Sequence, residues 1–411
     1  MVDTLKFCMV TTFYPPYNFG GDGIYIYRLS NELARRGHQV DVIHCRDAFL
    51  VLSSSVKGDY PNHPNVKVHG LKSSAGFLSP FLTQQTGRPF LKSPLRKILA
   101  ENQFDIIHFH NMSLMGITTL QYGNAIKLYT MHEHWLVCPM HVLWKFNREI
   151  CTERSCIQCQ IRGKRPPQLW RYTNLLHDYL AKVDAFISPS RFTLNKHHQL
   201  GFQYPIRHIP YFLPRTEEAS EDASSQPQDR RFFLFVGRLE KIKGIQNLIP
   251  VFRNHPEYEL LIAGDGEYGD ELRKLSADVP NMRFLGRLNY NELRKLYREA
   301  LAVIVPSICY EVFGIIIIEA FSMKTPVIVH NLGGLSEVVE DSGGGFTYNN
   351  EAELLRAMKT LSSDWNIRTQ LGEMGYAAYL KYWTEENHFK LYFDLIESLQ
   401  KRRKSVQEAN A

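Results

Sequence analysis

Residues 302–330 read AVIVPSICYEVFGIIIIEAFSMKTPVIVH, and they carry the clearest fold signal in the chain. Two short apolar runs, 302–307 and 326–330, have the length and composition of buried strands. Between them, Gly314 opens a run of four isoleucines that is typical of a buried helix. A strand, a helix and a second strand in this order predict two parallel strands joined by a helical crossover.

The same alternation extends through both halves of the chain. Further apolar runs, each separated from the next by a stretch long enough for a helix, lie at 5–13, 39–45, 104–111, 127–134, 185–190, 232–237, 258–264 and 282–286. Repeated units of this kind form parallel sheets with helices on both faces. The sequence therefore predicts an α/β protein with two doubly wound domains.

A change of composition separates the two halves. Residues 214–230 read PRTEEASEDASSQPQDR and contain no aliphatic residue larger than Ala, which is typical of a linker. We expect a first domain over 1–213, with a Cys-rich insertion at about 138–165, and a second domain over 231–384. Within 385–411, a helix should run from about Glu385 to about Lys401 and be followed by a basic, frayed end.

Composition and length narrow the class of protein. The chain has 411 residues, 44% of them hydrophobic and 22% charged, which is typical of a folded globular protein with more than one domain. The start has no secretory signal pattern, and charged residues interrupt the longest apolar run, at 300–329. Seven Cys without a signal favour reduced thiols or metal ligands. We expect a cytoplasmic protein.

Positive charge is concentrated in the first half. Residues 1–213 contain 24 Lys and Arg against 13 Asp and Glu, whereas the rest of the chain is net negative. Such a surplus predicts a phosphate-rich ligand or an anionic membrane face as partner. Ordinary solvated side chains on a domain surface are an equally good interpretation.

Glu311 and Glu319 bracket the isoleucine run. Eight residues of helix span about 12 Å, so the two carboxylates could contact different parts of one ligand, such as a sugar and a ribose. Most isolated Glu pairs at this spacing are structural. Because the intervening helix is predicted to be buried, however, these carboxylates are costly unless they face a cleft or are paired.

This element resembles the E-x7-E motif of the retaining, nucleotide-sugar-dependent glycosyltransferases of family 4, including the opening E-x-F-G at Glu311 to Gly314. The resemblance covers nearly the whole chain. It implies the GT-B fold, two facing Rossmann-like domains, with the C-terminal helix returning to the first domain. It implies that Glu311 contacts donor-sugar hydroxyls, that Phe313, Gly314 and Ile315 belong to the donor site, and that Glu319 binds the ribose.

A second element, FVGRLEKIKGIQNLI at 235–249, is similar to the glycine-rich strand and loop of the same family. The resemblance implies that Arg238 and Lys243 clamp the leaving diphosphate and that Gly237 allows the backbone to approach it. Fixed cations favour the transition state because negative charge builds on the leaving group. No Asp-x-Asp occurs in the chain, so we expect catalysis without a divalent metal.

In the first domain, FYPPYNFGGDG at 13–23 looks like the family's glycine loop, which implies that Gly20 and Gly21 lie near the donor phosphates and the acceptor. A flexible surface turn is the alternative. His132 matches the family's active-site His and would contact the donor sugar. Glu133 departs from the Asp that usually follows, and a His taken alone is more often a satisfied core residue.

Four cysteines, Cys138, Cys151, Cys156 and Cys159, have the spacing C-x12-C-x4-C-x2-C. Four thiolates satisfy zinc in a closed tetrahedral site, so we expect structural zinc, with an iron–sulfur cluster or free thiols as alternatives. The basic and aromatic stretch that follows, at 161–180, could contact a membrane or an anionic lipid acceptor. Nucleic-acid binding is disfavoured, since it would leave Glu311 and Arg238 unexplained.

We therefore expect a retaining glycosyltransferase of the hexosyltransferase type. It would move a sugar from a nucleotide donor to an acceptor hydroxyl on a glycan, a lipid-linked or a small molecule, in cell-surface polysaccharide or glycolipid synthesis. Peripheral contact with the inner face of the membrane fits the basic first half. The alternatives are a same-fold sugar phosphorylase or nucleotide-sugar epimerase, and a non-catalytic nucleotide-sugar-binding or scaffold protein.

Overall fold

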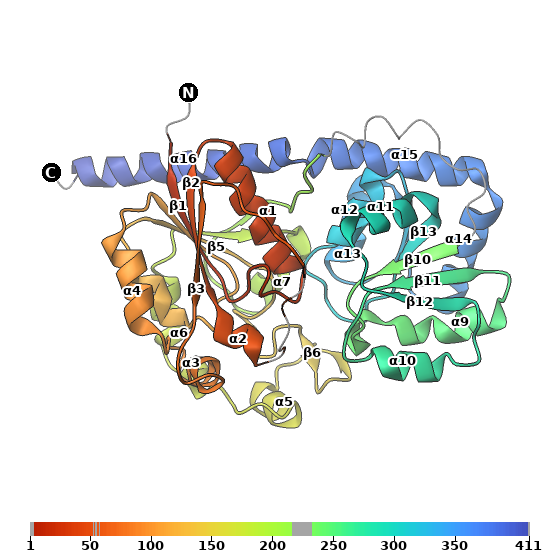
Figure 1. The fold of residues 1–411 in the computed structure, drawn as a ribbon, viewed down its shortest axis with the longest axis horizontal. Helices are drawn as coiled ribbons and strands as arrows, with labels where there is room; N and C mark the ends of the chain where they lie inside the picture. Colours follow the sequence, from red (N-terminus) through yellow and green to blue (C-terminus); the bar gives the residue numbers. More distant parts are fainter. Residues whose placement is uncertain (1–3, 52, 54–55, 57, 216–231, 410–411) are drawn as a thin grey trace. The chain divides into compact units, whose positions relative to one another are not determined.

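The protein is described by a computed structural model that covers residues 4–51, 53, 56, 58–215 and 232–409. The chain forms two compact units (Figure 1). The first unit comprises Met1–Pro189, Thr193–Ile209 and Phe389–Ala411, and the second comprises Ser190–Phe192 and Pro210–His388. The boundary between the units falls a few residues before the one expected at 213. The expected linker, 214–230, lies almost entirely outside the described residues.

The first unit is built on a seven-stranded sheet whose paired strands all run parallel, in the order β3-β2-β1-β4-β5-β8-β9. Its strands are β1 (Lys6–Val10), β2 (Gln39–Cys45), β3 (Val66–Leu71), β4 (Ile106–Phe109), β5 (Ile126–Thr130), β8 (Ala185–Ser188) and β9 (Ile206–His208). The inner strands are apolar and fully buried, because helices cover both faces of the sheet. The edge strand β3 is half exposed and more polar.

Short helices connect these strands. They are α1 (Gly21–Arg35), α2 (Arg46–Leu50), α3 (Leu78–Thr86), α4 (Lys92–Glu101), η1 (Ile117–Gln121), α5 (Cys156–Arg162), η2 (Leu169–Tyr172), α6 (Leu175–Leu180) and α7 (Arg191–Gln199). A small antiparallel hairpin with strands of two residues each, β6 (Trp144–Lys145) and β7 (Glu149–Ile150), lies in the Cys-rich insertion. Along β1, Cys8 and Val10 pack with α4 and η1, while Phe7 on the opposite face stacks on Tyr392.

The second unit has a six-stranded parallel sheet in the order β12-β11-β10-β13-β14-β15. Its strands are β10 (Phe232–Val236), β11 (Glu259–Ala263), β12 (Met282–Gly286), β13 (Ala300–Val305), β14 (Val327–His330) and β15 (Gly345–Tyr348). Its helices are η4 (Lys241–Lys243), η5 (Ile245–Asn247), α9 (Ile249–Asn254), α10 (Gly269–Leu275), α11 (Tyr290–Glu299), α12 (Ile315–Ser322), α13 (Gly334–Ser342), α14 (Glu351–Ser363) and α15 (Trp365–Tyr382). The α/β class predicted from the sequence is confirmed.

The last helix, α16 (Glu385–Ala409), runs further than the end near Lys401 that the sequence suggested. From Phe389 onward it belongs to the first unit. Tyr392 bonds His108 of β4, and Arg403 donates to the carbonyl of Ala125 at 2.7 Å. Among the described residues, no helix combines the length and the apolar content that crossing a membrane requires.

Candidate active site

The strongest polar cluster of the second unit follows strand β13. Lys243 Nζ lies 2.6 Å from Glu311 Oε1, and the Ser307 hydroxyl donates to the same oxygen at 2.8 Å. Lys243 comes from the short loop after β10, while Ser307 and Glu311 follow β13, which pairs with β10. Since neighbouring parallel strands end at the same edge, residues 68 positions apart meet there.

Glu311 and Lys243 are both charged in this cluster. Burial would raise the pKa of Glu311, but the Lys243 ammonium and the bonds from Lys243 and Ser307 outweigh it and hold the pKa below its usual value. Burial would likewise lower the pKa of Lys243, but Glu311 holds it above its usual value. The lysine and carboxylate side chains retain 22% and 19% exposure, so both remain reachable by a ligand.

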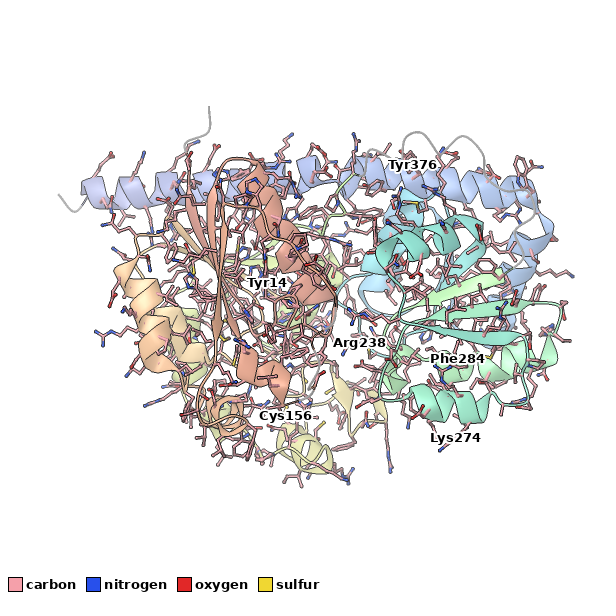
Figure 2. The ribbon with its side chains drawn as sticks, in the orientation of Figure 1. Tyr14, Cys156, Arg238, Lys274, Phe284 and Tyr376 are labelled. Carbon is pink, nitrogen blue, oxygen red and sulfur yellow. The ribbon has the colours of Figure 1, made fainter. Side chains whose placement is uncertain are left out.

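Arg238 lies near this cluster, but its closest partner is not one of the cluster's residues. Its guanidinium pairs with Glu240, and its side chain is half exposed. It also lowers the pKa of Glu311, which places its charge within reach of the cluster. The structure thus brings Arg238, Lys243 and Glu311 into one neighbourhood, as the sequence predicted, and Figure 2 labels Arg238 in this unit.

Two glycines, Gly264 and Gly244, allow neighbouring segments of main chain to pack closely around the cluster. Gly264 has φ +153°, and a side-chain carbon there would overlap the carbonyl oxygen of Gly237. Gly244 has φ +76°, and a side-chain carbon would overlap the carbonyl oxygen of Pro306. Only glycine suits such close approaches in this backbone conformation.

Helix α12 begins directly after the cluster. Gly314 is its N-cap residue, and no side chain caps the amides there. Phe313 is buried and packs edge-on against Tyr211 at 5.2 Å between ring centroids. The expected ligand-facing position of the Ile315 amide therefore coincides with an uncapped helix start. Further along, Glu319 Oε2 accepts a hydrogen bond from the Tyr297 hydroxyl at 3.1 Å.

The polar cluster of the first unit lies at the carboxyl edge of its sheet. His132 follows β5, and His110 follows β4; His110 Nδ1 and His132 Nε2 are 2.9 Å apart. Tyr25 of α1 packs on the His132 ring at 5.4 Å between centroids. Asn111 Nδ2 donates to Asp22 Oδ2 in the first turn of α1 at 3.3 Å.

Both histidines of the pair are held neutral. Burial lowers the pKa of His132 to about 4, an effect that Asp22 partly opposes. Burial, with His108 and His132 as neighbours, also drives the pKa of His110 well below its usual value. Two neutral imidazoles share one proton along their hydrogen bond, so His110 holds the ring of His132 in its orientation.

The glycine loop is less constrained than expected. Gly20 has extended backbone and is the N-cap of α1, and a side-chain carbon there would meet only the Asp22 carboxylate, at 3.3 Å. Asn18 bonds both the amide and the carbonyl of Gly20. The protein alone therefore does not require glycine at position 20, while Gly21 begins α1.

The Cys-rich insertion is a small irregular module. Cys138 is followed by the β6 and β7 hairpin, and Cys156 and Cys159 lie one turn apart on α5. All four thiols are free. Within the described part of the chain, no group of three or more His, Cys, Asp or Glu side chains is placed so that it could hold a metal ion. The tetrahedral ligand set expected from the spacing is thus not assembled here.

Acidification should destabilise the first unit. Burial lowers the pKa values of His44, His132 and His197 to about 4, from 6.5. Between these values the unfolded chain binds more protons than the folded chain, so stability falls as pH falls from about 6.5 toward 4. At pH 5 each histidine should remove about 2 kcal/mol of the free energy of unfolding.

Urea unfolding at pH 7.5 and pH 5 measures this effect. A His197→Gln variant should show a shallower fall between the two pH values, because one of the three groups is gone. Equal stability of the wild type at both pH values would contradict the argument.

Three residues that hydrogen-bond the site residues were not predicted from the sequence. Ser307, His110 and Tyr297 all bond a residue that was singled out. Ser307 and His110 stand at the ends of predicted strands, so strand-end position was a usable signal for both. Tyr297 lies on a different helix from Glu319, and nothing in the local sequence links them.

Comparisons with known families agree with this geometry. The family model described as Glycosyltransferase Family 4 matches residues 19–214. The model described as Glycosyl transferases group 1 matches residues 216–378. Between them the two models account for most of the chain, one in each half.

Individual relatives are of the same kind. An uncharacterised glycosyltransferase of Methanocaldococcus jannaschii is 28% identical over 392 residues, covering 89% of this chain and 90% of the relative. Sucrose-phosphate synthase from Thermosynechococcus elongatus superposes with a TM-score of 0.73 at 19% identity, covering 97% of this chain and all of that chain (100%). HepE of Anabaena, solved in complex with UDP-glucose, gives a TM-score of 0.66 at 16% identity, covering 97% of this chain and 100% of its own.

The two α/β units and these likenesses define a glycosyltransferase with the GT-B fold, as the sequence predicted. The chain belongs to the glycosyltransferases of the family 4 type, whose two domain models it matches in order.

Proposed function

We propose that the protein is a retaining hexosyltransferase that moves a sugar from a nucleoside diphosphate donor to an acceptor hydroxyl. The observation that carries this proposal is the cluster of Lys243, Glu311 and Ser307 beside the uncapped start of α12. It offers a carboxylate for sugar hydroxyls, an ammonium for a diphosphate, and backbone amides for an anion. The UDP-glucose complex of HepE supports a nucleotide sugar as donor.

The reaction can be written for these residues. The bond from the sugar C1 to the diphosphate oxygen breaks, and C1 bonds to the acceptor oxygen on the same face. The acceptor proton passes to an oxygen of the leaving diphosphate. Lys243 has three N–H donors, so it can hold Glu311 and a phosphate oxygen together and stabilise the charge that develops there. Arg238 adds a second cation, and no divalent metal is needed in this scheme.

The remaining donor contacts follow from the same proposal. Glu319 would bind the ribose, and the Gly314 and Ile315 amides would face the diphosphate. Gly237, with φ +156°, would allow the backbone to approach the phosphates. In the first unit, His132 would contact the donor sugar, and Gly20 and Gly21 would lie near the acceptor.

Differential scanning fluorimetry against nucleoside diphosphates and nucleotide sugars tests the donor assignment. One nucleotide should raise the melting temperature, equally with and without EDTA, and Glu319→Ala should weaken the shift. No shift with any nucleotide would overturn the proposal, and a shift that EDTA abolishes would overturn its metal-free form. Analysis of the products separates transfer from the phosphorylase and epimerase alternatives.

We infer that the protein acts in the cytoplasm, in cell-surface polysaccharide or glycolipid synthesis, with a glycan or lipid-linked acceptor. The seven cysteines, all free, fit a reducing compartment. The basic first half fits an anionic acceptor or an anionic membrane.

We also propose that Cys138, Cys151, Cys156 and Cys159 hold a structural zinc ion. Backbone amides already face two of the sulfurs: those of Leu143 and Met140 interact with Cys138, and that of Phe146 donates to Cys159 at 3.3 Å. Burial raises the pKa of the Cys138 thiol to about 11, and Cys156 and Cys151 add to this rise, which is consistent with thiols that lie near one another. Binding would require the four side chains to move toward a shared point, because they do not form a ligand set as the structure places them.

Metal analysis of the purified protein tests the zinc proposal. We expect about one zinc per chain, lost in a Cys156→Ser, Cys159→Ser double variant and kept in a Cys45→Ala control. Visible absorbance with bound iron would indicate an iron–sulfur cluster instead. Four thiols that react with a thiol reagent in metal-free protein would mean that the cysteines are simply free.

A further inference from the structure

Helix α3 (Leu78–Thr86) has its apolar side turned outward. Leu78, Phe81 and Leu82 follow the i, i+3, i+4 spacing of one helix face, and they are 44%, 41% and 40% exposed. The opposite face, which includes Ser79 and Thr83, is buried at 2% exposure each. A helix that only served the core of this unit would have the reverse orientation.

The exposed side continues beyond the helix. Phe77, Phe90 and Leu169 are 64%, 44% and 67% exposed. Trp170 ties the segments together, since its Nε1 donates to the carbonyl of Gln84 at 2.9 Å. We call this surface the α3 face: Phe77, Leu78, Phe81, Leu82, Phe90 and Leu169. Contiguous exposed apolar groups of this kind mark an interaction site.

The helix cannot simply turn over to hide these groups. The Thr83 hydroxyl donates to the Ser79 carbonyl at 2.9 Å and accepts the amide of Phe90 at 3.0 Å. The six-membered ring of Trp170 lies against Gly87 at the end of α3, where a side-chain carbon would meet it at 2.9 Å. The inward face is therefore fastened by specific bonds and packing, and the outward face is a fixed feature of the unit.

The two chain segments that form the α3 face are rich in positive charge. The two segments that form it, 72–100 and 154–177, contain ten Lys and Arg and no Asp or Glu. Most of these cations are exposed: Lys72, Arg88, Lys92, Arg96, Lys97, Arg154, Arg162, Lys164 and Arg165. These segments supply much of the positive surplus of the first half. Acidic residues stand directly beyond these segments, at Glu101, Glu153 and Asp178, but the cations outnumber them. An apolar centre with a surplus of cations around it fits a partner that is apolar inside and anionic at its surface.

We propose that the α3 face docks on an anionic lipid bilayer, with Phe77, Phe81 and Leu82 in the headgroup region and the surrounding cations on lipid phosphates. A second copy of the chain fits poorly, because a symmetric pairing of this face would bring like charges together. The inference deepens the proposed function, since it would bring a lipid-linked acceptor to the enzyme. Vesicle binding is measured without nucleotide, so its failure is distinguishable from failure of the donor site.

Sedimentation with vesicles tests the proposal on the full chain. The wild type should bind vesicles of phosphatidylcholine and phosphatidylglycerol in equal parts and should not bind pure phosphatidylcholine. Two variants, Phe81→Ser with Leu82→Ser and Arg88→Glu with Lys92→Glu, should each lower the affinity at least about tenfold. Because the first replaces exposed side chains and the second only charges, both should keep the wild-type melting temperature.

The matched control lies on α10 of the second unit, where Lys274 and Leu275 are exposed neighbours (Figure 2). Lys274→Glu with Leu275→Ser should bind vesicles as the wild type does. Absence of wild-type binding, or wild-type affinity in both α3-face variants, would overturn the proposal. So would sedimentation-velocity data that show a dimer in the wild type and a monomer in the Phe81→Ser, Leu82→Ser variant, because the face would then join two copies.

Discussion

Replacing Lys243 or Glu311 by Ala should lower turnover at least about 100-fold, which corresponds to about 2.7 kcal/mol of transition-state stabilisation. Each variant removes one half of the 2.6 Å pair and leaves the other charge without its partner. In the proposed mechanism, Lys243→Ala removes the ammonium that would meet the diphosphate, and Glu311→Ala removes the carboxylate that would hold the sugar. Steady-state kinetics with the nucleotide sugar found by fluorimetry measures the loss.

The two residues should act as a unit. The double variant should lose much less than the product of the two single losses, because either single change already breaks the pair. Arg253→Ala is the matched control, since Arg253 forms an exposed ion pair with Asp278 in the same unit at 2.7 Å. It should keep wild-type turnover. Wild-type turnover in Lys243→Ala or Glu311→Ala, with a normal melting curve, would remove these residues from the active site.

The second large effect concerns the histidine pair of the first unit. His132→Ala should lower turnover by about 100-fold or more, as the loss of a positioned catalytic side chain does. His110→Ala should cost about tenfold, because His110 is a positioning residue that acts through its 2.9 Å bond to His132. Loss of the His110 side chain should change kcat more than KM. The pH profile of turnover should also shift, because the pKa of His132 depends on its neighbours.

Another buried histidine of the same unit supplies the control. His197 has a similarly lowered pKa, and its Nδ1 bonds the Thr193 carbonyl at 2.8 Å. His197→Gln should alter stability and leave turnover unchanged. If His110→Ala and His197→Gln have equal turnover, His110 has no positioning role. Full activity of His132→Ala would contradict the assignment of His132.

The inner strands were predictable because burial on both faces makes them continuous apolar runs. The runs at 104–111, 127–134 and 302–307 contain β4, most of β5 and most of β13. Edge strands β3, β9 and β15 were not predicted, since an edge strand is covered on fewer sides and its sequence stays mixed. The end of α16 was placed too early, because its basic last turns resemble a frayed tail.

Residues of the second-unit cluster could be singled out from the sequence because they follow the ends of predicted strands. Glu311 and Lys243 were singled out from two separate motifs, and the pairing of β10 with β13 explains why they meet. The bond between His110 and His132 depends on the order of strands in the sheet, which the sequence pattern does not state. The outward face of α3 was equally hidden, because its apolar spacing is that of an ordinary core helix.

The most direct test of the account is the stereochemistry of donor turnover. The donor that raises the melting temperature should be consumed slowly in the absence of acceptor, with water in its place, and proton NMR can record the anomeric signal before mutarotation. We predict that the sugar released by the wild type first appears with the same anomeric configuration as the donor, and that Glu311→Ala releases no sugar. A first product of the opposite configuration, or no turnover of a nucleotide sugar that binds, would contradict a retaining glycosyltransferase.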